Sequence, residues 1–137
     1  MRRTVQGIQA LNLKFDTIIS SPYLRARQTA EIVAKYGRLM NRPYLKKQTI
    51  HFTNNLLPPA TVKELLQEVQ KNFPKSKNIL FVGHEPHLSG MICSLLQCDK
   101  PLTIDLKKGG LCYLSFRQGQ AALNWLLTPR QLSLMAL

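Results

Sequence analysis

The chain contains at residues 78–86 the stretch NILFVGHEP, an apolar run that stops at a glycine followed by a histidine. The run does not alternate between apolar and polar residues, which is typical of a parallel strand covered on both faces. A helical pattern follows, whose apolar residues are Leu88, Met91, Ile92, Leu95 and Leu96. The stretch therefore predicts a strand of an α/β sheet that runs into a helix, with His84 at the junction.

A second strand-to-helix junction lies at residues 17–30, TIISSPYLRARQTA. Its first residues form a β-branched run, and Pro22 stands where a first-turn proline is tolerated. The apolar face of the predicted helix consists of Ala26, Ala30 and Val33. Gly37 can end this helix. Arg25 falls in the first turn, where free backbone N–H groups and the helix dipole favour an anion.

Periodicity predicts the remaining elements. We expect a helix over residues 2–13, a short strand within residues 45–52, a helix capped by Thr61 and ended by Pro74, and three C-terminal strands. The strands are expected at residues 102–106, 112–116 and 123–127, with a hairpin turn at residues 107–110 joining the first two. This order predicts one domain over residues 1–137, an α/β three-layer sandwich with a mixed, mostly parallel central sheet flanked by helices.

The composition is that of a globular protein with an excess of positive charge. Among 137 residues there are 19 Lys and Arg against 7 Asp and Glu, a net charge of +12. The charge fits a phosphorylated substrate, a nucleic acid or a solvated surface. No apolar run approaches the ~20 residues of a membrane span, so we expect a cytoplasmic protein without membrane contact. The number and spacing of the cysteines fit neither a set of disulfides nor a metal-binding pair. We expect buried free thiols at Cys93, Cys98 and Cys112.

The pattern SPxxRAxQTA at residues 21–30, together with GHEP at residues 83–86, resembles the motifs of the histidine phosphatase superfamily. The short chain, the paired glycines at 109–110 and the LTP at 127–129 look most like its SixA-type phosphohistidine phosphatases. The resemblance implies a phosphoglycerate-mutase-like fold and a phosphate pocket to which Arg25 and His84 contribute. Ser21 either binds the phosphate as well or caps the helix. No cofactor is implied.

The same resemblance implies the reaction and the partner. The substrate is a protein phosphorylated on histidine, such as a signalling protein, and the phosphoryl group passes through a phosphohistidine of the enzyme. Between Glu31 and Glu64 there is no Asp or Glu to act as general acid, and a weak P–N bond demands little acid help. We expect no metal site, because Pro86 separates His84 from His87 and a third ligand is lacking.

The chain departs from the family at its start. The superfamily opens with an apolar strand ending in Arg-His-Gly, whose histidine becomes phosphorylated. The histidines here are His51, His84 and His87, and none follows an arginine. We therefore expect an N-terminal truncation, an inactive chain, and self-association through the gap left in the sheet.

Two alternatives to the phosphatase remain. In the first alternative, the chain is a catalytically inactive pseudophosphatase that binds phosphate or a phosphoprotein. In the second, it is a basic nucleic-acid-binding protein. Only the net charge motivates the second, and no aromatic-basic RNA motif is present. We expect no specific nucleic-acid binding.

Overall fold

The computed structural model describes residues 2–36, 38–39, 50–99 and 103–136. Three strands form a parallel sheet in the order β4-β2-β5. The strands are β4 (Ile50–Phe52), β2 (Thr17–Ser20) and β5 (Ile79–Val82). Ser20, at the end of the central strand, lies opposite Phe52 on one side and Val82 on the other. All three strands therefore end at the same edge of the sheet.

Alternation along the strands divides the core into two layers. Ile18 and Leu80 belong to one apolar cluster, and Ile19 and Phe81 belong to the other. The first cluster is completed by α1 (Arg2–Ala10), α2 (Leu24–Tyr36) and α5 (Pro129–Met135), and the second by α3 (Val62–Asn72) and α4 (His87–Leu95). The predicted α/β fold, a parallel sheet covered by helices on both faces, is confirmed.

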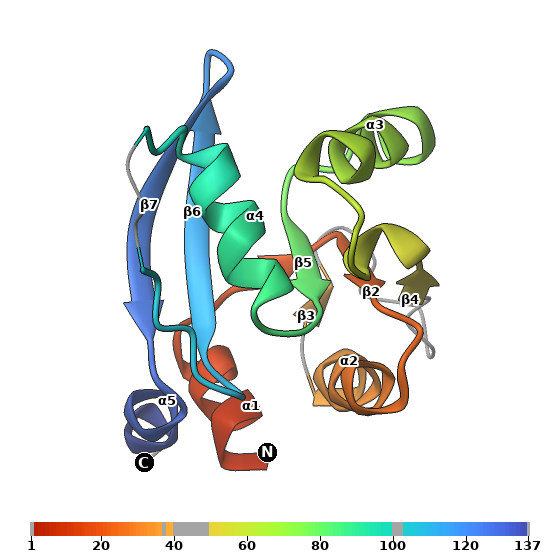
Figure 1. Ribbon diagram of the computed structural model, residues 1–137. Coiled ribbons are helices and arrows are strands. Elements are labelled where there is room, and N and C mark those ends of the chain that lie inside the picture. Colours follow the sequence, from red (N-terminus) through yellow and green to blue (C-terminus); the bar gives the residue numbers. More distant parts are fainter. Residues whose placement is uncertain (1, 37, 40–49, 100–102, 137) are drawn as a thin grey trace.

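The chain changes direction across this sheet. It leaves β2 through α2 and reaches β4 on one side, then passes through α3 to β5 on the other side (Figure 1). The helices that follow β2 and β5 consequently lie on opposite faces, α2 in the first layer and α4 in the second. In open α/β sheets such a reversal opens a crevice at the carboxyl ends of the two strands, where ligands bind. By this rule, the ligand crevice of the fold is expected between the ends of β2 and β5.

The C-terminal part is an antiparallel hairpin of β6 (Leu111–Arg117) and β7 (Gln120–Leu127). Its turn consists of Gln118 and Gly119, with φ of 53° and 76°. Two positive φ values in a two-residue turn match the right-handed twist of the strands, and glycine adopts them without strain. The hairpin stands apart from the parallel sheet in Figure 1.

This hairpin corrects two predictions. Residues 103–106 form no strand, and the turn at 107–110, closed by the Gly110 N–H donating to the Lys107 carbonyl oxygen at 2.8 Å, does not join a hairpin. The segment runs along α4 instead, where the Ser89 hydroxyl donates to the carbonyl oxygen of Ile104 at 3.0 Å. The alternating apolar residues of 103–106 therefore lie beside a helix and do not pair with a strand.

The other predicted elements agree with the structure to within a few residues. The first helix ends at Ala10, and the predicted capping box of Thr61 is present at the start of α3. Two further strands, β1 (Lys14–Phe15) and β3 (Arg38–Leu39), form a small parallel pair. Gly37 and most of residues 45–52 lie outside the described residues. Within the described ranges, no helix is long and apolar enough to cross a bilayer.

The cysteines were predicted less well. They were expected to be buried, but Cys98 is exposed and Cys93 and Cys112 are only half-buried. Cys98 follows the end of α4, where the chain turns toward solvent, so its apolar sequence neighbours do not enclose it.

Candidate active site

Ser21 and His84 meet at the carboxyl ends of β2 and β5. The hydroxyl oxygen of Ser21 lies 2.7 Å from Nε2 of His84, although the two residues are 63 positions apart in the chain. Each follows its strand by one or two residues, and the pairing of β2 with β5 brings the two ends together. The structure thus joins two of the predicted site residues in one hydrogen bond within the crevice.

Ser21 is held by the backbone around it. Its side chain is fully buried, and its N–H donates to the carbonyl oxygen of Val82 at 2.9 Å, which extends the ladder between the strands by one residue. The hydroxyl oxygen accepts a hydrogen bond from the N–H of Tyr23 at 3.2 Å. This contact shapes the turn from β2 into α2, in part the capping function predicted for Ser21.

Contacts of its backbone and of its ring hold His84 in place. Its carbonyl oxygen accepts the N–H of Leu88 at 2.8 Å, and its ring lies 5.4 Å from the ring of Tyr23, centroid to centroid, at 49°. Gly83 precedes it, and a Cβ at Gly83 would lie only 3.1 Å from the Leu88 side chain. A larger residue there would require the Leu88 side chain to shift by a few tenths of an ångström.

Arg25 lies in the first turn of α2, as predicted, and its side chain is exposed. Over the described part of the chain, its guanidinium forms no ion pair with a carboxylate. The first turn of α2 also contains no acidic residue. Among the described residues no hydrogen bond links Arg25 to His84, so the convergence of the two side chains on one anion stays a prediction.

Arg27 contacts Glu31 and Phe52. Its Nε donates to the Glu31 carboxylate at 3.1 Å, and its guanidinium carbon lies 5.6 Å above the ring of Phe52. The α4 helix also differs from α2, because the Glu85 carboxylate already accepts the N–H of Ser89 in its first turn at 3.1 Å. In α2, by contrast, no acidic residue lies in the first turn, which suits anion binding there.

His87 does not belong to the Ser21–His84 pair. Its Nδ1 lies 3.2 Å from the carbonyl oxygen of Leu56 and its Nε2 lies 2.7 Å from that of Ala60. The imidazole therefore holds the loop between β4 and α3 against the start of α4. Within the described ranges, no cluster of three metal-ligating side chains occurs.

A polar cluster under this loop was missed from the sequence. The Glu68 carboxylate accepts hydrogen bonds from Thr53 at 2.5 Å and from Asn55 at 2.7 Å, and it lies 2.7 Å from Nε2 of His51. Burial raises the pKa of Glu68, but these hydrogen bonds and the charge of His51 outweigh it and hold the pKa below its ordinary value. A general acid needs the opposite shift, so Glu68 is a structural acceptor.

For one of the missed residues, Glu68, the sequence contained a signal. Glu68 stands beside the apolar stripe of its helix, next to Leu65 and Val69, and a carboxylate in such a position needs hydrogen-bond donors. Tyr23 directly follows the proline of the first motif, and its contact with His84 depends on the pairing of β2 with β5. No local sequence pattern predicts the contact between Tyr23 and His84.

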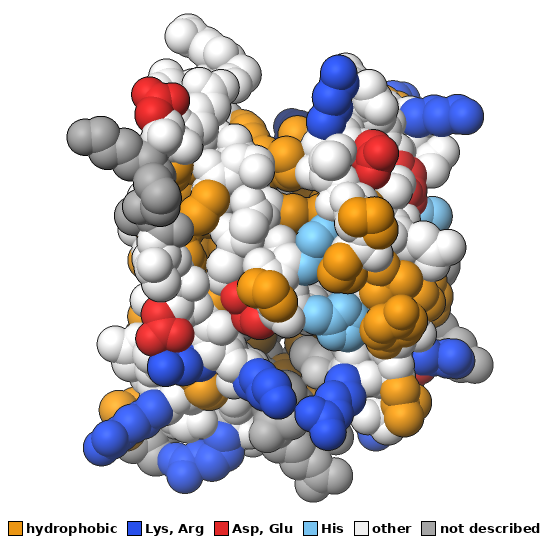
Figure 2. Space-filling view, viewed as in Figure 1, with side chains coloured by type: hydrophobic (Ala, Val, Ile, Leu, Met, Phe, Trp, Pro, Cys, Tyr) orange, Lys and Arg blue, Asp and Glu red, His pale blue; other side chains and the backbone are white. Residues whose placement is uncertain are grey.

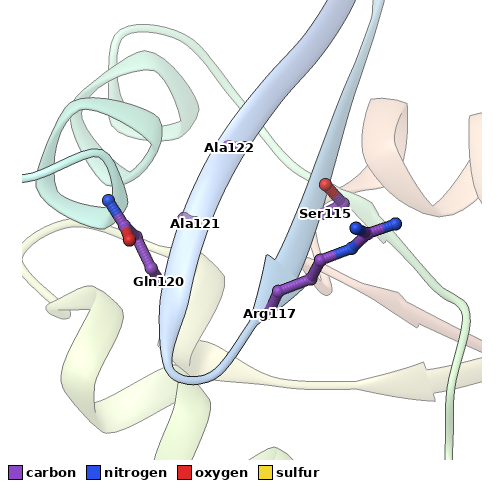
Figure 3. Close-up of a pocket in the computed structure, with 5 residues that line it drawn as sticks. All are labelled: Ser115, Arg117, Gln120, Ala121 and Ala122. Atoms are coloured by element: carbon purple, nitrogen blue, oxygen red, sulfur yellow. The ribbon is translucent and has the colours of Figure 1, made fainter.

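The surface around the site combines apolar and basic side chains. Figure 2 shows histidine side chains at the surface beside a group of apolar ones, with Lys and Arg side chains nearby. Tyr23, Leu24 and Phe52 are among the large apolar side chains that the structure leaves exposed. A separate hollow of about 410 Å³ is lined by β6 and β7 residues only, among them Ser115 and Arg117 (Figure 3), so it contains none of the candidate site residues.

Comparisons with known proteins agree with this fold. No family model matches the chain. An uncharacterized protein of Picosynechococcus sp. is 32% identical over 121 residues, which cover 87% of this chain and 67% of that protein. The histidine phosphatase SixA, solved with tungstate, superposes with a TM-score of 0.73 at 20% identity over 96% of this chain and 80% of its own. The α-ribazole phosphatase of Shigella flexneri gives 0.66 at 15% identity over 93% and 81%. The chain belongs to one family with the Picosynechococcus protein, and its fold is that of the two phosphatases.

Proposed function

We propose that this chain is the phosphate-binding scaffold of a SixA-type protein-phosphohistidine phosphatase. The observation that supports the proposal is the Ser21–His84 pair at the carboxyl ends of β2 and β5, with Arg25 in the first turn of the helix that follows β2. Phosphoryl transfer depends on donors and positive charge aimed at the three equatorial oxygens of the transferred group. His84, Arg25 and the N–H groups of α2 supply both.

Each group has a distinct role in the transfer. The Arg25 guanidinium pairs with two phosphoryl oxygens through its planar donors, and His84 donates to a third oxygen as negative charge develops there. The P–N bond of the substrate breaks as the phosphorus bonds to the nucleophile, and the electron pair leaves with the imidazole nitrogen of the substrate. Imidazole is a good leaving group, so this transfer needs little help from a general acid.

The nucleophile in this proposal is the histidine of an Arg-His-Gly strand that the 137 residues do not contain. Room for a strand is available at β5, which pairs only with β2 among the described strands, just as β6 pairs only with β7. A strand added in parallel to the free edge of β5 would end at the same edge as His84. Without such a strand, the free edges favour self-association.

The alternative is a pseudophosphatase, which binds a phosphorylated protein at the same crevice without turnover. The two functions share one prediction, anion binding at Arg25 and His84, and differ in turnover.

Anion binding is tested first, by titrating the 137-residue protein with tungstate, a phosphate analogue, in a calorimeter. Arg25→Ala should weaken binding by about tenfold or more, since it removes a charged hydrogen-bond donor worth roughly 1.5–3 kcal/mol. Arg27→Ala is the matched control, because it removes the same charge two residues away while Arg27 is paired with Glu31. Equal losses in both variants would mean general charge attraction, and no binding by the unmodified protein would refute the site.

Turnover separates the two functions. The genomic sequence upstream of Met1 is examined for an in-frame strand ending in Arg-His-Gly, and the chain is expressed with and without it. A phosphatase should hydrolyse phosphohistidine on a protein only in the longer form, because loss of a covalent nucleophile removes a factor on the order of 10⁴–10⁶ in rate. A longer form with the motif but without turnover would establish the binder.

A further inference from the structure

The hydroxyl of Ser21 has a fixed hydrogen-bond direction. Its side chain is fully buried and has two partners in the described structure, the N–H of Tyr23 at 3.2 Å and Nε2 of His84 at 2.7 Å. The amide can only donate, so the hydroxyl oxygen accepts that bond. The single hydroxyl proton is left to point at Nε2 of His84, the one acceptor within reach among these two partners.

This direction determines which ring nitrogen of His84 carries a proton. Nε2 must offer a lone pair to the Ser21 hydroxyl, so the proton of the neutral imidazole lies on Nδ1. In the reverse arrangement, Nε2–H would donate to Ser21, and the hydroxyl proton of a fully buried side chain would have no acceptor in the described part of the chain. Leaving a buried donor unsatisfied is unfavourable.

We propose that Ser21 is a positioning residue that holds Nε2 of His84 so that the ring presents Nδ1–H to the bound oxyanion. Nδ1 has no hydrogen-bond partner among the residues the structure describes, and the Tyr23 ring restrains the imidazole from the side. Ser21 therefore acts on the phosphoryl group through His84 and does not touch it. The identity of the oxyanion rests on the proposed function, whereas the tautomer does not.

The tautomer is measured by long-range ¹H–¹⁵N NMR of histidine-labelled protein, in which protonated and unprotonated ring nitrogens resonate far apart. His84 should show its proton on Nδ1 in the unmodified protein and lose that preference in Ser21→Ala. Ser20→Ala is the matched control, because Ser20 is also fully buried but its hydroxyl donates to the Ser21 carbonyl oxygen at 2.8 Å and not to His84. Ser21→Thr, which keeps the hydroxyl, should restore the Nδ1–H form.

Two results overturn the proposal: His84 protonated on Nε2 in the unmodified protein, or an unchanged tautomer in a folded Ser21→Ala variant. The first measurement needs no variant, so it decides the matter even if Ser21→Ala fails to fold. Tungstate affinity provides a second readout. Ser21→Ala should lower it on the order of tenfold, and Ser20→Ala should leave it unchanged.

The same data separate this inference from the proposed function. A protein with Nδ1–H on His84 that binds no tungstate refutes the phosphate site but leaves the action of Ser21 on the ring intact. A protein that binds tungstate with Nε2–H on His84 supports the phosphate site and refutes the positioning role.

Discussion

The packing of α1 against α5 gives the sharpest test of the fold. Gly7 lies in the middle of α1 and is buried against the backbone of Leu132 in α5. A Cβ at Gly7 would lie 2.7 Å from the carbonyl carbon of Leu132 and closer still to its oxygen. Ordinary carbon contacts are about 3.5–4.0 Å, so Gly7→Ala forces the helices apart by roughly 1 Å.

Two effects of opposite sign decide the result. Alanine in place of glycine favours an exposed helix by about 1 kcal/mol, whereas overpacking a rigid contact costs about 1–3 kcal/mol or more. The obstruction at Leu132 is backbone, which no side-chain rotation can move, so overpacking should prevail and Gly7→Ala should be destabilised. Gly90→Ala is the matched control in α4, because a Cβ there meets no atom within 4 Å. It should stabilise the protein by up to about 1 kcal/mol.

Urea unfolding followed by circular dichroism measures both variants. A difference of about 1–3 kcal/mol between them corresponds to a separation of midpoints on the order of 1 M, since small proteins have slopes of roughly 1–3 kcal/mol per molar urea. Gly7→Ala unfolding at the same urea concentration as Gly90→Ala would refute the close contact of α1 with α5.

Two further predictions concern charge. Glu68 has a lower pKa in the folded protein than its unfolded value of about 4.3, so it stabilises the fold above that pH, and the contribution is lost as pH falls through the folded pKa. The free energy of unfolding should therefore fall more between about pH 6 and about pH 3 in the unmodified protein than in Glu68→Gln, and equal losses in urea titrations would contradict this. The net charge of +12 should give only sequence-independent DNA binding that disappears by ~200 mM salt, and sequence-selective retention in a filter assay at that salt would overturn the expectation.

The elements that frame the crevice could be predicted because their signals are local. The apolar run before Gly83 and the β-branched run before Ser20 identify the two strands, and both junction motifs place their side chains at strand ends. That strand ends meet at one edge follows from parallel pairing. Predicting that Ser21 pairs with His84 requires the register of β2 against β5, and no residue pattern specifies that register.

The features that escaped prediction depend on distant contacts. The α5 helix has only seven residues, too few to form alone, and it exists because Leu132 is buried against α1. The Glu68 cluster joins a helix to residues up to 17 positions away. The segment at 103–106 has strand-like alternation but no partner strand, and the contact with Ser89 decides its path.

The hydrogen bonds of the three histidines bear on the nucleophile. A histidine that accepts a phosphoryl group must offer an unprotonated nitrogen at an anion-binding site. Both nitrogens of His87 face carbonyl oxygens, those of Leu56 and Ala60 in the loop before α3, and not the Ser21–His84 pair. His51 lies 2.7 Å from the Glu68 carboxylate, whose negative charge repels an incoming phosphate.

His84 belongs to the proposed anion site, but neither of its ring nitrogens has a lone pair available to attack phosphorus. Its Nε2 lone pair accepts the Ser21 hydroxyl, and the proton on Nδ1 makes that nitrogen a donor to the oxyanion, which suits a residue that stabilises charge and not one that attacks phosphorus. Incubating the 137-residue protein with phosphoramidate should therefore leave no phosphohistidine detectable by mass spectrometry. In a form extended by an Arg-His-Gly strand, the phosphoryl group should map to the histidine of that strand. Phosphorylation of His51, His84 or His87 in the 137-residue protein would show that this hydrogen-bond reasoning assigns the wrong role to that residue.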